Sequence, residues 1–124
     1  MRRTLIATTV VLALAGCGSA SSTGSVSDEE IGASVLQQFD SGNGNGGQDV
    51  GAYRGELDIL TGKCTNSTKD VARFIENTYN LEVQAGITDE TALSLLQHLD
   101  QSLPAGVKTD CQSALATYLT LREG

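Results

Sequence analysis

Apolar residues recur at helical spacing along most of the chain after residue 26. In the first such segment, a serine followed by three acidic residues at 27–30 is typical of a helix start, because the serine oxygen can accept a free backbone N–H. Acidic side chains also suit the positive end of the helix dipole. The apolar stripe of this helix consists of Ile31, Val35, Leu36 and Phe39, and its predicted end is Asp40.

A second helix is predicted after a loop of glycines and asparagines at 41–48. Two glycines, Gly51 and Gly55, weaken it by about 1 kcal/mol each relative to alanine. Its apolar positions still follow helical spacing: Val50, Tyr53, Leu57 and Leu60.

Three further helices are predicted between residues 67 and 122, and each has its own start and stop signals. The first begins after Ser67 and ends at Gly86, with the stripe Val71, Phe74, Ile75, Thr78 and Leu81. The second has Thr88 as its predicted N-cap and Pro104 as its stop, with the stripe Ala92, Leu95, Leu96, Leu99 and Leu103. The third follows a capping box that begins at Thr109, with the stripe Cys111, Ala114, Leu115, Tyr118 and Leu119.

Short connections between helices favour antiparallel neighbours, so residues 67–122 predict an up-down-up three-helix bundle. The expected fold is therefore all-α: a small helical bundle made of this C-terminal three-helix unit and one or two N-terminal helices. We expect a single domain at 27–124, with the N-terminal helices in 27–62 and the three-helix bundle in 63–124.

The pattern of apolar residues before residue 27 differs from the helical stripes that follow it. Arg2 and Arg3 precede an apolar run at 4–15, which is shorter than the about 20 residues that a membrane-spanning helix needs. The run ends in Leu14-Ala15-Gly16-Cys17, which resembles the lipobox of bacterial lipoprotein precursors. The resemblance implies that residues 1–16 are a signal peptide and that Cys17 carries a diacylglyceryl lipid. An ordinary signal peptide, with Cys17 incidental, is the alternative.

The lipobox resemblance also implies a location, the extracytoplasmic face of a bacterial cell membrane. Two acyl chains anchor a protein stably where one anchors it only marginally. Residues 17–26 are rich in Gly, Ser and Thr and are expected to form a flexible tether that spans about 15–18 Å. The folded part would thus remain close to the bilayer.

Charge narrows the range of partners. The leader holds two of the eight basic residues and none of the fifteen acidic ones, which leaves six basic residues and a net charge of −9. Such a chain repels phosphates, so nucleic acid is not an expected partner. Anionic lipid headgroups repel it as well, so the lipid on Cys17 is the expected contact with the membrane.

Three cysteines would leave one unpaired in a secreted protein. If Cys17 carries lipid, Cys64 and Cys111 remain as a pair, and an up-down-up bundle places both at the same end. We therefore expect a structural disulfide, which closes a loop of about 47 residues and contributes roughly 4 kcal/mol. A redox or metal site is the alternative, but the chain has no CxxC and only one histidine.

Candidate chemistry is sparse. His98 is the only histidine and flanks an apolar stripe, and no nucleophile or orienting group can be assigned to it. We expect no catalytic residues, no cofactor and no metal site. An enzyme would need a carboxylate pair brought together by the fold.

The loop at 40–49 partly matches a calcium-binding loop through Asn43, Asn45 and Gly46. Ser41 and Ala52, however, occupy positions where calcium needs carboxylates, so Asp40 and Asp49 could supply only a weak site. The predicted function is accordingly a non-enzymatic binding or protein-interaction module at the cell envelope, with an envelope protein as its possible partner. The alternative is an accessory or sensor protein with a weak calcium- or small-ligand-binding loop at 40–49.

Overall fold

The computed structural model describes residues 27–124. Five helices follow one another along these residues, and no strand forms within them. They are α1 (Asp28–Gly42), α2 (Val50–Thr61), α3 (Thr68–Gln84), α4 (Ala92–Ser102) and α5 (Cys111–Glu123). The predicted all-α fold is confirmed, and both N-terminal helices are present.

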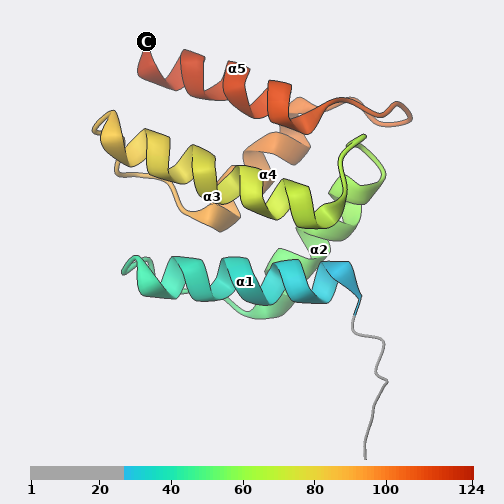
Figure 1. The fold of residues 1–124 in the computed structure, drawn as a ribbon, viewed down its shortest axis with the longest axis horizontal. Helices are drawn as coiled ribbons and strands as arrows, with labels where there is room; N and C mark the ends of the chain where they lie inside the picture. The colour runs from blue at the N-terminus through green and yellow to red at the C-terminus, as the bar shows by residue number, and fades with distance from the viewer. Residues whose placement is uncertain (1–26) are drawn as a thin grey trace, which may run out of the picture.

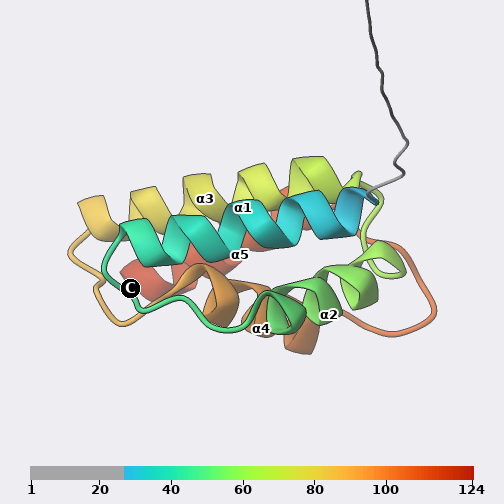
Figure 2. The ribbon, with the colours of Figure 1, turned by 90° about the horizontal axis from the view of Figure 1, so that it is seen from below.

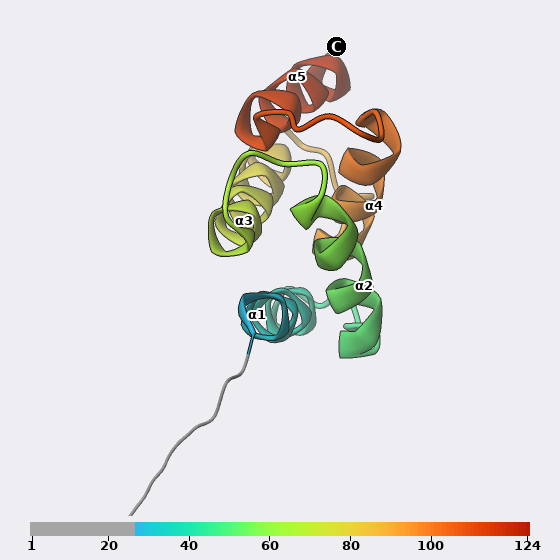
Figure 3. The same cartoon turned by 90° about the vertical axis from the view of Figure 1, so that its right-hand side faces the viewer.

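The helices lie in two layers. Helices α1, α3 and α5 lie side by side and run in the same direction, from right to left in Figure 1. Helices α2 and α4 form the second layer behind them, as the end-on view in Figure 3 shows. The chain therefore crosses between the layers at each connection, and α3, α4 and α5 have the predicted up-down-up order.

One apolar core joins the two layers. Helix α1 packs against α2, α3 and α4, so the first two helices share their core with the last three. All five helices contribute to this core, which contains no tryptophan and relies on leucines. Its largest fully buried apolar side chains are Tyr53, Leu36, Leu57, Leu60, Ile75, Leu95, Leu96 and Leu115.

Two of the predicted helix starts are confirmed, and two lie elsewhere. The hydroxyls of Ser27 and Ser67 accept backbone N–H groups of α1 and α3, as expected. The N-cap of α4 is Thr91 rather than Thr88, and Thr91 forms a reciprocal capping box with Ser94. For α5 the cap is Asp110 rather than Thr109, because Thr109 is held in an isolated β-bridge to Cys64.

The predicted disulfide closes one end of the molecule. Cys64 and Cys111 are bonded, with their Cα atoms 5.4 Å apart, and both residues are buried. Beside them, the Thr109 N–H donates to the Lys63 carbonyl at 2.8 Å, and Lys63 Nζ reaches Asp100 Oδ1 at 2.7 Å. The starts of α3 and α5 are therefore fixed together both covalently and by hydrogen bonds.

Candidate functional site

The predicted apolar stripe of α1 only partly faces the core. Leu36 is buried and Phe39 packs against the core, but Ile31 is 51% exposed and Val35 is 43% exposed. The buried face consists instead of Gly32, Ala33, Leu36 and Asp40. Helix α1 is therefore rotated about its axis relative to the predicted orientation. Gly32 lets α1 lie close to α2, because a Cβ at this position would be only 3.2 Å from Leu57 Cδ1.

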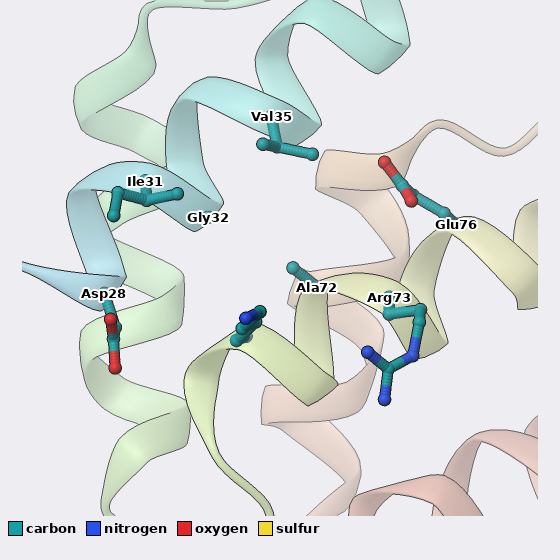
Figure 4. A pocket seen from close by; sticks show the side chains of 8 residues that line it. Asp28, Ile31, Gly32, Val35, Ala72, Arg73 and Glu76 are labelled. Carbon is teal, nitrogen blue, oxygen red and sulfur yellow. The ribbon is translucent and has the colours of Figure 1, made fainter.

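The rotation leaves a groove of about 340 Å³ between α1 and α3. In Figure 4, Ile31 and Val35 project from α1, and Ala72 of α3 points toward that helix. Gly32 and Ala72 are the small residues of the lining, so the side chains of Ile31 and Val35 lie beside a space that they do not fill. The groove is lined by Asp28, Ile31, Gly32, Val35, Lys69, Ala72, Arg73 and Glu76.

Charged residues are present along the groove. Asp28 lies at the start of α1, and Lys69 and Glu76 lie on α3. Arg73 extends away from α1 and pairs with Asp70 of its own helix at 2.7 Å. Burial raises the pKa of Glu76, which is the half-buried carboxyl of this groove. A cation brought to Glu76 would therefore offset the cost of its partial desolvation.

Asp40 has a structural role that its position in the predicted loop site did not suggest. Helix α1 continues two residues past its predicted end, and the Asp40 carboxylate is buried, with 1% of the residue exposed. The Tyr53 hydroxyl donates to it at 2.6 Å. The backbone N–H groups of Ala92 and Leu93 donate at 2.7 and 3.2 Å, so Asp40 caps α4 from another helix.

This arrangement commits Asp40, one of the two carboxylates of the predicted loop site, to internal hydrogen bonds. Both Asp40 oxygens accept internal hydrogen bonds, and the Asn45 amide is directed toward Asp40 and the Tyr79 hydroxyl. Burial, together with the bond to Asp40, raises the pKa of Tyr53 to about 12. Within residues 27–124, no group of three or more His, Cys, Asp or Glu side chains is placed to hold a metal ion.

The fold brings together two glutamates that the sequence did not single out. Glu82 of α3 is fully buried, and Glu90 in the connection before α4 is 5% exposed. Glu90 accepts from the Ser94 and Tyr118 hydroxyls at 2.7 and 2.6 Å. Glu82 has no hydrogen-bond partner for either carboxylate oxygen.

Arg122 of α5 lies between these carboxylates. Its Nε is 3.8 Å from Glu82 Oε2 and 4.0 Å from Glu90 Oε2, and its Nη2 pairs with the exposed Asp89. Burial raises the pKa of Glu82 to about 7, and Glu90 adds repulsion that Arg122 partly offsets. Burial and the bond to Glu90 also raise the pKa of Tyr118.

His98 lies at the outer edge of this cluster. Its ring stacks on Tyr118 with centroids 5.4 Å apart, and its Nε2 is 3.5 Å from Glu90 Oε2. The side chain is 46% exposed, which agrees with the expected boundary position. The two glutamates beneath it are closed to a substrate by their burial, so the carboxylate pair does not form an open catalytic cleft.

Sequence reasoning missed Glu82 and Glu90 for different reasons. Glu82 directly follows Leu81, which the stripe placed inside but which is 47% exposed. Glu90 lies two residues after Thr88, the predicted N-cap, but the helix begins three residues later, so Glu90 belongs to the preceding connection. The sequence signal for the actual start of α4 was the spacing of Thr91 and Ser94, three residues apart, which allows the two side chains to cap the helix reciprocally.

The remaining predicted residue, Cys17, lies outside the described residues, as do the leader and the tether. Among the described helices, none combines the length and apolar character needed to cross a bilayer. Comparisons of the chain with known protein families, with curated proteins and with solved structures give no match.

Proposed function

We propose that the protein is a lipid-anchored, non-enzymatic interaction module of the bacterial cell envelope, and that it binds its partner through the α1–α3 groove. The observation that carries this proposal is the half-exposed pair Ile31 and Val35 beside an unfilled hollow. Aliphatic side chains in water have an unfavourable hydration free energy, and a partner that covers them recovers about 25 cal/mol per Å².

The occupant that best fits the groove is a basic amphipathic helix of an envelope protein. Ile31 and Val35 are one helical turn apart, a spacing that matches the i and i+4 residues of a second helix. Two acidic and two basic residues line the groove, but Arg73 is already paired with Asp70. The half-buried Glu76 and the exposed Asp28 therefore outnumber Lys69 and would accept cations that flank the apolar residues. The net charge of −9 after the leader would attract a basic partner over a longer range.

Photo-crosslinking in intact cells tests the groove. The full-length protein would carry a photo-crosslinking amino acid at position 35, and a matched control would carry it at position 83. Val83 suits the control because it is 48% exposed and does not line the groove. We expect an adduct at position 35 but not at 83, and mapping of the captured peptide should show a basic amphipathic helix.

A charge reversal completes this test. Glu76→Lys should lower the yield of the position-35 adduct at least tenfold, because it replaces attraction by repulsion. Equal adducts at positions 35 and 83 would contradict the proposal, as would an adduct with lipid, with a second copy or with an acidic segment.

The anchor has a separate test. Cys17→Ala removes the proposed lipid attachment, and the protein should then leave the membrane fraction when cells are fractionated. If the Cys17→Ala protein stayed firmly in the membrane fraction, the proposed anchor would be wrong. The groove would still be tested by its own crosslinking experiment. This separation matters because a groove can bind a partner whether or not the chain is lipidated.

A further inference from the structure

The Glu82–Arg122 cluster contains a buried carboxyl group without a hydrogen-bond donor. Both Glu82 oxygens are inaccessible to solvent and have no hydrogen-bond partner, and Arg122 Nε, 3.8 Å from Glu82 Oε2, also lacks one. An ionised carboxylate in such a place is less stable than a hydrogen-bonded one, because no donor compensates for its lost hydration. The neutral acid is therefore the form that this position favours.

Every neighbouring element places a charged or titratable group near Glu82. The connection before α4 contributes Asp89 and Glu90, and α4 itself contributes only the more distant His98. Helix α5 contributes Arg122, which is shared among the three carboxylates, and Tyr118, which donates to Glu90. With every carboxylate ionised, one guanidinium would face three negative charges.

The same cluster attaches the C-terminal half of α5 to the rest of the molecule. Only Cys111 and Leu115, both in the first half of α5, are buried, and Leu121 is 75% exposed. Apart from the partly buried Tyr118 and Leu119, the second half is held by two polar contacts: Arg122 with the carboxylates and the Tyr118 hydroxyl with Glu90. A change in charge at Glu82 would therefore act on the least buried part of the fold.

We propose that Glu82 and Arg122 form a proton-sensitive latch that holds the second half of α5 against α3 and the connection to α4. The latch is closed while Glu82 is neutral. When Glu82 loses its proton, the new negative charge lies next to Glu90 and has no hydrogen-bond donor. When the second half of α5 separates from α3 and from the connection to α4, water reaches the Glu82 carboxylate and its repulsion with Glu90 is relieved.

The direction of the pH dependence follows from the burial of Glu82. Its pKa of about 7 in the closed form lies above the ordinary 4.5 that an open, hydrated form would have. The closed form is thus most favoured below pH 4.5 and is progressively lost as the pH rises toward 7. Between pH 6 and pH 8.5, linkage predicts that the ratio of closed to open α5 falls about tenfold.

Amide hydrogen exchange of the full-length chain tests the latch, with protection factors corrected for the intrinsic effect of pH. We expect protection in residues 117–123 to fall about tenfold from pH 6 to pH 8.5, while protection in α1 stays constant. In the same samples, the ¹³C signal of the Glu82 carboxyl should titrate near pH 7. Titration near pH 4.5, or an equal loss of protection in α1, would overturn the proposal.

Three variants make the test specific. Glu82→Gln keeps the size of the side chain but cannot ionise, so α5 protection should no longer change with pH. Glu123→Gln, an exposed change on the same helix, should behave like the wild type. Arg122→Gln removes the shared cation, so it should raise the Glu82 midpoint and lower α5 protection at every pH. If Glu82→Gln kept the wild-type pH response, or if Arg122→Gln left the midpoint unchanged, the latch would be wrong.

Discussion

Asp40 and Glu82 are both buried carboxylates at the same end of the helix stack, on α1 and α3, but their surroundings differ. Asp40 accepts hydrogen bonds from the Tyr53 hydroxyl and from two backbone N–H groups at the start of α4. Glu82 accepts none, and its nearest cation is 3.8 Å away. From this comparison we infer that the donors around a buried carboxylate, rather than its burial, decide whether it stabilises the fold.

The largest expected effect is at Asp40. Asp40→Ala removes the acceptor of three buried hydrogen bonds. The donors, which are the Tyr53 hydroxyl and the backbone N–H groups of Ala92 and Leu93, would then be buried without a partner. We expect the free energy of unfolding to fall by about 3–5 kcal/mol, measured by denaturant titration. Asp49→Ala, in the nearby loop, should change it by less than about 0.5 kcal/mol. Similar losses for the two variants would contradict the role assigned to Asp40.

At Glu82 we expect a substitution to raise the free energy of unfolding rather than to lower it. Glu82→Met replaces an unpaired carboxylate by an apolar side chain of similar size, so at pH 8 the free energy of unfolding should rise by about 1–3 kcal/mol. The pKa of about 7 in the fold exceeds the ordinary 4.5, so the wild type loses stability as pH rises between these values. The advantage of Glu82→Met should therefore be small at pH 4.5 and full above pH 7. A variant less stable than the wild type at pH 8 would reverse the comparison.

The two tyrosines that donate to buried carboxylates allow a finer comparison. Tyr53 is fully buried, whereas Tyr118 is partly exposed. Tyr53→Phe should lower the free energy of unfolding by about 1.5–3 kcal/mol, because it breaks a buried hydrogen bond to a charged group. Tyr118→Phe should cost less, about 1 kcal/mol, since the Tyr118 side chain is itself partly exposed to water. Thermal melts of both variants would show whether this order holds.

The smallest effect is expected at His98. Its side chain is 46% exposed, stacks on Tyr118 and lies 3.5 Å from Glu90 Oε2 at the edge of the Glu82 cluster. His98→Ala should change the free energy of unfolding by no more than about 0.5 kcal/mol. A larger loss, seen in the same denaturant titration, would mean that the cluster extends to the surface.

Much of the fold was predictable because its signals are local. The stripes of α2 and α4 face the core as expected, and Ser27 and Ser67 cap their helices through contacts that span only a few residues. The disulfide was predicted because the lipobox resemblance set Cys17 aside, and the helix order places the two remaining cysteines at one end. The groove was not predictable, because Ile31 and Val35 match a buried stripe as well as Leu36 does. In the fold, Gly32 faces Leu57 across a close contact, and Ile31 and Val35 are turned outward.

The sequence alone determined the all-α class, the three C-terminal helices and the excess of acidic residues, because each depends on spacing or composition. The pairing of Cys64 with Cys111 was predicted from the lipobox resemblance, which set Cys17 aside, together with the order of the helices. The tertiary structure decided which face of α1 is buried and which carboxylates receive donors. Asp40 meets partners 13 to 53 residues away, and Glu82 meets Arg122 from another helix. Contacts between residues so far apart depend on how the helices pack, and no local pattern in the chain encodes them.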